Sequence, residues 1–172
     1  MVPQTAMPAM DERTFRDVMG VFATGVAVIT TEVDGNPQGM TVNSLTSLST
    51  RPPKLLVCLT EGTRTANAVT ARGAFVVNLL NRDQRHLSDR FAKPGKEHFE
   101  GLSTLLTDEG LPALPGAAGR IECEVEAVHD GGDHIIVVGR VTACQATPTS
   151  PLLFYRGRYE RLAGHEETAF SN

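Results

Sequence analysis

Residues 119–146 read GRIECEVEAVHDGGDHIIVVGRVTACQA, and this stretch decides the fold. Its first part alternates apolar residues with glutamates, which is typical of a strand with one face in the core and the other in water. The glycine-rich turn HDGGD (129–133) then reverses the chain into a second strand, residues 134–146. The alternating residues are Ile121, Glu122, Cys123, Glu124, Val125, Glu126 and Ala127. The stretch therefore predicts a long antiparallel hairpin.

Outward from this hairpin, short β-branched or apolar segments separated by turns indicate further strands. About seven strands with tight connections favour an antiparallel closed barrel over parallel βαβ units. Residues 92–118 are rich in glycine and proline and are expected to form a long loop. The remaining strands are expected at residues 26–31, 41–50, 54–60, 74–80 and 154–162, with a turn at 34–37.

Three short helices are expected beside the strands. One begins at Asp11, and its apolar residues recur at helical spacing as a single stripe. A second runs from Thr63 to Arg72 and is closed by Gly73. A third begins at Asn81, with Gln84 completing a capping box, and ends near Phe91. The stripe of the first helix consists of Phe15, Val18, Met19 and Phe22.

Length and charge restrict the class of protein. The 172 residues fit one domain, which we place at 11–163 between tails at 1–10 and 164–172. A formal net charge of −4 argues against a nucleic-acid or anionic-membrane partner, since both favour a basic face. No run has the length of a membrane span and the N-terminus lacks the features of a signal peptide, so a cytoplasmic location is expected.

The cysteines and histidines give no sign of a metal site. Cys58, Cys123 and Cys144 form no CxxC pair and lie in apolar runs, so we expect reduced thiols in the core. His129 and His134 flank the same hairpin turn, but two ligands are too few for zinc. We therefore expect no metal.

Residues 41–50, TVNSLTSLST, depart from the alternation of a half-buried strand. Hydroxyl residues dominate, so the segment is either a solvated edge strand or a strand lined for a polar ligand. The chain also has no HExxH, GxSxG, Walker or GxGxxG motif. Without a nucleophile or an acid–base pair, the chemistry is expected to come from a bound cofactor.

Taken together, these segments resemble the short flavin reductases with the FMN-binding split-barrel fold, which supply reduced flavin to two-component flavin-dependent monooxygenases. The resemblance spans residues 13–160 in the family's order, so it implies a mainly β, antiparallel split β-barrel with two or three flanking helices. The DGGDH and PLLFYRGRY motifs resemble reductases that serve aromatic-ring hydroxylases, of phenolic or steroid-derived rings. The matching stretches are FRDVMGVFATGVAVITT, GMTVNSLTSLSTRPPKLLVCL, TRTANAV, FVVNLL, HLSDRFA, GDHIIVVGRV and PLLFYRGRY.

The resemblance implies a flavin site along the polar strand. A flavin presents ring nitrogens, carbonyl oxygens and ribityl hydroxyls, which suits a strand with backbone donors and small hydroxyl groups. Thr63 and Thr65 lie at a helix start, where free N–H groups favour a phosphate, although ordinary capping by threonine looks the same. Arg90 and Phe91, with Lys93 and Lys96 beyond them, are placed near the phosphate and adenine portions, or else at a solvated helix end. The other implied flavin residues are Thr41, Val42, Asn43, Ser44, Ser47, Cys58, Leu59 and Thr60.

A nicotinamide site is implied beside the flavin. His134 of the GDH motif would approach the nicotinamide and is the one catalytic residue expected, unless it is a hairpin histidine that faces water. The last-strand motif would lie beside the NAD(P)H site, and a charged edge strand is the alternative. This motif consists of Tyr155, Arg156, Gly157 and Arg158.

The resemblance therefore implies a homodimeric NAD(P)H:flavin oxidoreductase that reduces FAD or FMN, using NADH or NADPH. The reduced flavin would diffuse to a partner monooxygenase. Two alternatives remain open, a pyridoxamine-phosphate-oxidase-like flavoprotein oxidase and a flavin-binding carrier without turnover. The choices between FAD and FMN, and between NADH and NADPH, stay open at this point.

Overall fold

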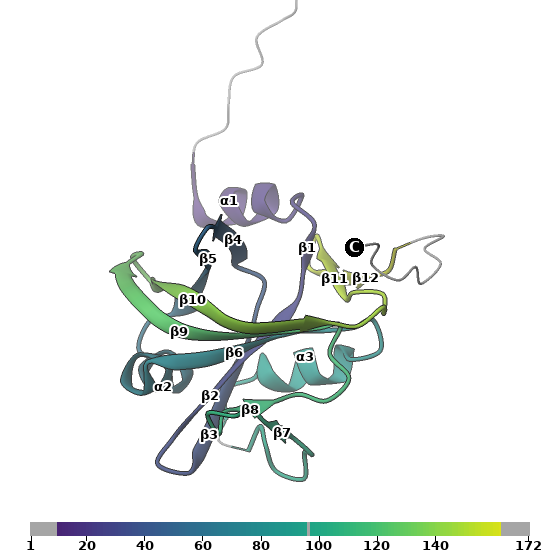
Figure 1. The fold of residues 1–172 in the computed structure, drawn as a ribbon. Helices are drawn as coiled ribbons and strands as arrows, with labels where there is room; N and C mark the ends of the chain where they lie inside the picture. The colour runs from purple at the N-terminus through teal and green to yellow at the C-terminus, as the bar shows by residue number, and fades with distance from the viewer. Residues whose placement is uncertain (1–9, 96, 163–172) are drawn as a thin grey trace, which may run out of the picture.

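A seven-stranded antiparallel sheet forms the body of the molecule (Figure 1), in the order β3-β2-β6-β9-β10-β5-β4. The computed structural model describes residues 10–95 and 97–162. Every pairing in this sheet is antiparallel, which confirms the predicted mainly β fold class. Its strands are β2 (Ala27–Val33), β3 (Asn36–Val42), β4 (Leu45–Thr50), β5 (Pro53–Thr60), β6 (Ala74–Leu79), β9 (Gly119–Asp130) and β10 (His134–Ala146).

Two smaller sheets form in segments where the prediction was wrong or incomplete, at residues 154–162 and within the loop at 92–118. Residues 154–162 do not form one strand, because β11 (Leu153–Tyr155) and β12 (Arg158–Glu160) make a tight hairpin that pairs with β1 (Thr24–Gly25). Its turn residues, Arg156 and Gly157, have φ values of 48° and 75°, as a two-residue hairpin turn requires. The segment predicted as a long loop contains a short ladder of β7 (Leu105–Leu106) and β8 (Pro112–Ala113).

Three helices form, as predicted, and they are α1 (Glu12–Met19), α2 (Arg64–Arg72) and α3 (Arg85–Phe91). Helix α2 has the predicted ends, since Thr63 caps it and Gly73 closes it at φ 72°. Helix α3 begins later than predicted. The Gln84 side chain does accept from the Asn81 N–H at 3.1 Å, but the Gln84 N–H donates to the Asn81 carbonyl at 3.0 Å, so these residues form a turn before the helix.

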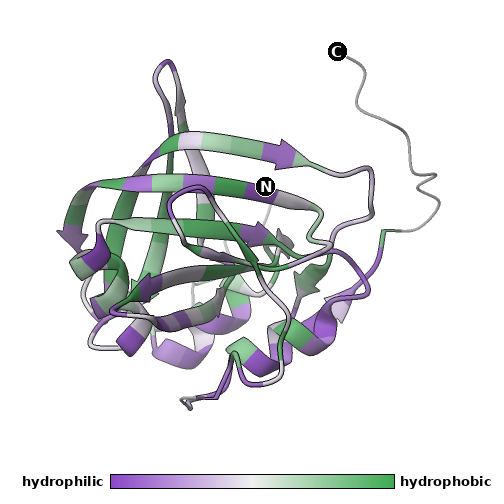
Figure 2. Ribbon diagram, turned by 60° about the horizontal axis from the view of Figure 1, so that its bottom comes forward, coloured by the Kyte–Doolittle hydropathy of each residue, from purple (hydrophilic) through white to green (hydrophobic). Residues whose placement is uncertain are grey.

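The core lies inside the curved sheet, and Figure 2 shows many hydrophobic residues along its strands. Val57, Leu59, Phe75, Val77 and Val137 are all 0% exposed there. A second apolar cluster joins β2 to α3 and contains Val28, Leu80, Leu87, Phe91 and Leu114. This second cluster fixes α3 against the sheet, next to β3.

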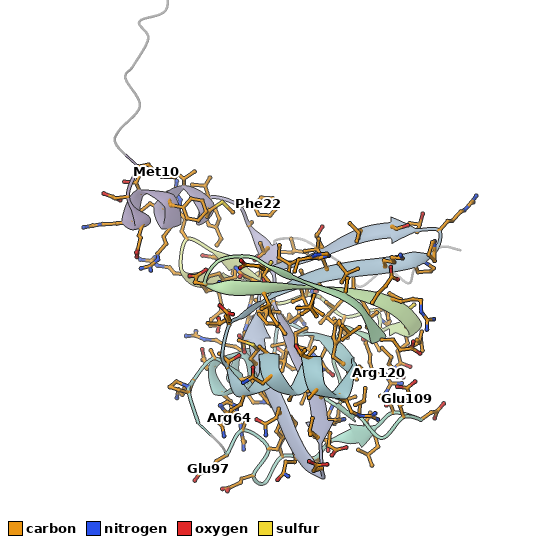
Figure 3. All side chains as sticks on the ribbon, turned by 90° about the vertical axis from the view of Figure 1, so that its left-hand side faces the viewer. Met10, Phe22, Arg64, Glu97, Glu109 and Arg120 are labelled. Atoms are coloured by element: carbon orange, nitrogen blue, oxygen red, sulfur yellow. The ribbon has the colours of Figure 1, made fainter. Side chains whose placement is uncertain are left out.

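Helix α1 stands away from this core (Figures 1 and 3). Of the predicted apolar stripe, Phe15, Val18 and Met19 lie on the helix, whereas Phe22 lies beyond its end at Met19. All four face solvent, with exposures of 53%, 64%, 50% and 69%. None of the helix residues is buried. Among the described residues, no helix is long and apolar enough to cross a membrane.

The glutamates of β9 face outward, as predicted, but each is ion-paired. Glu124 pairs with Arg140 on the neighbouring strand β10, and Glu126 pairs with Lys54 of β5, one strand further along the sheet. Glu122 pairs with Arg120 at 3.3 Å and its side chain is only 16% exposed. The outer face is therefore partly covered by its own charged side chains.

The cysteines differ from one another in exposure. Cys123 is buried, as predicted, while Cys58 is partly buried. Cys144 is exposed, so its prediction as a core thiol was wrong. It lies in the C-terminal half of β10, where the strand extends past the core and most residues face solvent.

Candidate functional site

The polar segment 41–50 is not one strand. Strand β3 ends at Val42 and β4 begins at Leu45, so Asn43 and Ser44 link the two ends of the seven-stranded sheet. The Ser44 hydroxyl donates to the Cys58 carbonyl at 2.8 Å, and the Cys58 N–H donates to the Ser44 carbonyl at 3.2 Å. Side-chain hydroxyls that bond to backbone carbonyls allow the chain to change direction here.

Thr41, at the end of β3, joins the sheet to α3. Its hydroxyl donates to the Ser88 carbonyl at 2.8 Å. The side chain of Val42 points the other way, into the core, and is 8% exposed. Like Leu59, which is fully buried, Val42 can offer a ligand only its backbone groups. Ser47 lies on β4 and is exposed.

A cavity of about 460 Å³ lies between the middle of β3, the end of β5, the start of α2 and the end of α3. We call it the α2–α3 cavity. It brings together four residues that the sequence assigned to the flavin, namely Thr60, Thr63, Thr65 and Phe91. The complete lining is Gln38, Gly39, Met40, Thr60, Gly62, Thr63, Arg64, Thr65, Phe91, Ala92, Lys93, Pro94, Gly95 and His98.

The start of α2 gives the cavity its electrostatic character. The Thr63 hydroxyl donates to the Thr60 carbonyl at 2.8 Å and accepts from the Ala66 N–H at 3.3 Å. The first N–H groups of a helix lack partners within the helix and point toward its N-terminal end, where they favour an anion. The lining adds the cations Arg64 and Lys93 and contains no carboxylate. These donors fit a phosphate group.

The opposite wall is built by Phe91 and the loop that follows it. Phe91 is 2% exposed, and its ring centroid lies 5.4 Å from that of His98 and 5.1 Å from that of Phe99. Gly39 lets β3 approach this ring, because a Cβ there would lie 2.8 Å from Phe91 Cε1. Phe91 therefore shapes the wall and can bind a ligand only through its backbone and the edge of its ring.

Arg90 holds the same loop in place. Its Nη2 donates to the Glu97 carbonyl at 3.0 Å and also to the Glu100 carbonyl. The guanidinium therefore has a structural role that the sequence did not suggest, and direct contact with a phosphate stays a prediction. Lys96, also considered from the sequence, lies outside the described residues.

His98, Gln38 and Met40 line the cavity but were not identified from the sequence. Gln38 and Met40 directly precede the polar segment, so their position could have suggested them. His98 had no such signal. It reaches the cavity through an irregular loop, where its Nε2 bonds to the Lys93 carbonyl at 2.7 Å.

Asn43 lies at a second cavity, of about 270 Å³, on the side of α1. Phe22 and Thr24 precede the sheet and line this cavity together with core residues of β2, β3, β4 and β6. The Thr24 hydroxyl is buried and, among the described residues, has no hydrogen-bond partner. The structure thus separates Asn43 from the threonines of the α2–α3 cavity.

His134 begins β10 and lies directly opposite Thr60 in the ladder with β5. Its Nε2 is 3.3 Å from the Thr60 hydroxyl, and its Nδ1 is 2.7 Å from Asp133 Oδ1. The side chain is 40% exposed. Since Thr60 also lines the α2–α3 cavity, His134 lies at the edge of that cavity.

The last-strand motif lies next to α1. The Arg156 N–H donates to the Gly20 carbonyl at 2.9 Å, and the Arg156 guanidinium lies 5.4 Å from the centroid of the Tyr155 ring. Gly157 and Arg158 complete the hairpin turn. On the far strand, the Tyr159 hydroxyl bonds to Ser88 at 2.8 Å and donates to Asp89 at 3.0 Å, which attaches this hairpin to α3.

Residues 19–163 match the family described as "Flavin reductase like domain". A reductase subunit of a flavin-dependent monooxygenase, HsaB of Mycobacterium tuberculosis, is 40% identical over 92% of this chain and 87% of its own length. FMN reductase (NADH) SmoA of Agrobacterium fabrum is 38% identical over 89% of this chain and 87% of its own length.

Solved structures agree in fold. Nitrilotriacetate monooxygenase component B from Mycobacterium thermoresistibile has 41% identity and a TM-score of 0.86, covering 93% of this chain and 91% of that one. The Streptomyces globisporus NADH:FAD oxidoreductase SgcE6, solved with NAD and FAD fragments, has 34% identity and a TM-score of 0.86, covering 92% and 98%. With the sequence family matched over most of its length and the fold shared with these reductases, the chain belongs to the flavin reductase like domain family and has its split-barrel fold.

Proposed function

We propose that this flavin reductase transfers hydride from NADH to a flavin in the α2–α3 cavity and releases the reduced flavin to a separate monooxygenase. Flavin reductase activity was predicted from the sequence and is shared by the named relatives. The observation that carries the proposed site is the convergence of Thr60, Thr63, Thr65 and Phe91 on one cavity beside His134. FAD or FMN and NADH are the cofactors we propose.

The donor set of the cavity fits a flavin phosphate. The start of α2 directs its first N–H groups toward its N-terminal end, and Arg64 and Lys93 add positive charge to the lining. A flavin bound here would accept a hydride from reduced nicotinamide. The chain itself would position the two rings, and good positioning of reactants lowers a barrier by about 7–11 kcal/mol in favourable cases. No side chain has to act as a nucleophile.

The remaining proposed contacts lie around this cavity. Ser44 and Cys58 present backbone groups at the link between β3 and β4, close to Thr41. His134 would contact the nicotinamide at the Thr60 end. Asn43, Ser47 and the motif at 155–158 stay predictions, because they lie at the second cavity, on the exposed edge of β4 and beside α1.

A homodimer is the assembly we propose, supported by the exposed apolar stripe of α1. Apolar side chains that recur on one face of a helix and pack on nothing are typical of an interface. The partner component would be a flavin-dependent monooxygenase, as for the HsaB relative. The aromatic substrate of that monooxygenase and the cytoplasmic location stay predictions from the sequence.

Oxidation of NADH by the purified chain tests the function, with free FAD or FMN added in increasing amounts. A reductase gives many turnovers per protein and a rate that saturates with added flavin. A flavoprotein oxidase would consume an organic substrate instead, and a carrier would bind flavin without oxidising NADH. Either of those results would overturn the proposal.

Release of reduced flavin needs its own measurement. Under anaerobic conditions, a redox dye enclosed behind a dialysis membrane that retains the protein should become reduced when NADH and flavin are supplied. Omission of flavin is the control, since NADH alone passes the membrane without reducing the chosen dye. A dye that stays oxidised, although NADH has reduced the flavin on the protein's side of the membrane, would show that the flavin remains bound.

A further inference from the structure

Both ring nitrogens of His134 have a partner from a different part of the chain. Asp133 Oδ1 lies 2.7 Å from Nδ1, and the Thr60 hydroxyl lies 3.3 Å from Nε2. Asp133 belongs to the turn before β10, whereas Thr60 ends β5. The plane of the imidazole is therefore set from two sides.

The backbone around Asp133 is fixed by three hydrogen bonds. The Gly131 N–H donates to the His134 carbonyl at 2.8 Å, and the Gly132 N–H donates to Asp130 Oδ1 at 2.8 Å. The Glu61 N–H donates to the Asp133 carbonyl at 3.1 Å and so attaches the turn to β5. A side chain at Gly131 would not fit, because its Cβ would lie 2.8 Å from the His134 carbonyl oxygen.

These partners select one tautomer of a neutral His134. An ionised carboxylate only accepts hydrogen bonds, so the proton of the ring must be on Nδ1. The hydrogen bond from His134 is the main cause that lowers the pKa of Asp133, and the charges of His134 and Arg16 lower it further. With Nδ1 protonated, Nε2 has one lone pair, and in this structure the Thr60 hydroxyl lies 3.3 Å away as its donor until a ligand N–H replaces it.

We propose that Asp133 is a positioning residue that holds Nε2 of His134 as a hydrogen-bond acceptor at the edge of the α2–α3 cavity, where an N–H of the ligand replaces the Thr60 hydroxyl. The ligand suited to this acceptor is a primary amide, which offers two N–H donors. The carboxamide of reduced nicotinamide has this group, so the inference rests on the proposed function. Asp133 acts through His134 and needs no contact with the ligand.

The direct test is the tautomer of His134, read from nitrogen chemical shifts in protein with labelled histidine and assigned with His134→Gln. The wild-type protein should show Nδ1 protonated and Nε2 free at a pH where the ring is neutral. Asp133→Ala should lose this pattern, whereas Asp133→Asn should retain part of it, because the amide oxygen still accepts from Nδ1–H. An unchanged tautomer in Asp133→Ala would overturn the proposal.

Kinetics give the second readout. Asp133→Ala should raise the KM for NADH about threefold to tenfold, as expected for one weakened hydrogen bond, with flavin affinity unchanged. Glu61→Gln is the matched control, since it removes a neighbouring negative charge at an exposed side chain. Equal effects of Glu61→Gln and Asp133→Asn would show that only charge matters, and would overturn the positioning role.

The experiments distinguish a failure of the proposed function from a failure of the positioning role of Asp133. If the wild-type chain does not oxidise NADH, or if His134→Ala keeps the wild-type KM and kcat, the nicotinamide role of His134 is lost. The chemical shifts would still report whether Asp133 sets the tautomer, because they require no turnover. If His134→Ala loses NADH affinity while Asp133→Ala does not, the function stands and the positioning role fails.

Discussion

The side chain of Arg90 holds the loop that helps to shape the α2–α3 cavity. Its guanidinium donates to the carbonyls of Glu97 and Glu100, which lie on the loop beyond the cavity wall. Arg90→Gln should therefore destabilise the fold by about 1–3 kcal/mol, since it removes charge-assisted hydrogen bonds, and should weaken flavin binding. Urea unfolding and flavin titration measure the two effects.

Arg90→Lys is the matched variant for this prediction, because it keeps the charge but loses the planar fork that reaches two carbonyls. It should fall between the wild type and Arg90→Gln in both measurements. A fully stable Arg90→Gln with weakened binding of the phosphate would instead support direct contact with the flavin.

The thiols of Cys123 and Cys144 should differ in reactivity. Burial raises the pKa of the Cys123 thiol to about 12, and nearby Cys144 and Glu122 act in the same direction. The thiolate is the reactive form, so Cys123 should resist alkylation at pH 8 until the protein unfolds. Exposed Cys144 should react early, and Cys144→Ser should remove that early reaction in a timed thiol assay. Early labelling of Cys123, located by peptide mass mapping, would contradict this assignment.

Single residues could be predicted where the signal was local. Thr63 and Gly73 were assigned correctly because helix caps depend on a few adjacent residues. The partners of Arg90 and the cavity position of His98 could not be predicted, because an irregular loop brings them there. The exposure of Cys144 depends on how far β10 extends beyond the core, which its apolar neighbours do not reveal.

Among the elements, the β9–β10 hairpin contains a position that tolerates no side chain. A Cβ on Gly139 would lie 2.7 Å from Phe75 Cζ and 3.0 Å from Cys123 Cβ, inside the closed core. Gly139→Ala should therefore destabilise the protein by about 1–3 kcal/mol, because the buried ring has no space to move. Gly25→Ala is the control, since nothing lies within 4 Å of its Cβ position. Equal stability of both variants in urea unfolding would show that Phe75 repacks freely.

Periodicity predicted this hairpin well, and it failed where the chain changes direction. The alternation at 119–128 matches β9 because one face is core and the other is ion-paired. The segment 41–50 was assigned to one strand, but Ser44 bonds to Cys58 across the sheet and ends the run at Asn43. The hairpin turn at Arg156 was missed, because a non-glycine residue at positive φ gives no turn signal.

For the molecule as a whole, the stripe of α1 predicts the assembly. Phe15→Glu and Val18→Glu should each shift the protein toward the monomer, because a charge on an apolar contact loses its hydration. Light scattering after size-exclusion chromatography measures the mass. Arg13→Glu, on the opposite face of the helix, should leave the mass unchanged. A monomeric wild type, or a dimer in all three variants, would exclude the stripe as the interface.

The sequence predicted that α1 is amphipathic but not what covers it. A stripe of apolar residues has the same period whether it packs on its own sheet or on another chain. Only the structure shows that Phe15 and Val18 meet no core. The overall barrel, by contrast, followed from strand count and tight turns, and the family resemblance covered the same residues.

The order of the sheet places β3 and β4 at its two ends, although they are joined by only Asn43 and Ser44. The barrel is therefore closed along a seam by this covalent linkage, with no β3–β4 ladder among the described strands, while the Thr41 hydroxyl bonds to α3 and the Ser44 hydroxyl bonds to β5. Amides facing the seam should exchange with deuterium faster than those of β6 or β9, which are bonded on both sides. Faster exchange there would mean that the seam opens locally while the inner residues of the barrel stay protected. A flat aromatic ring could thus enter and leave at a rate set by this local breathing, while global unfolding remains far slower.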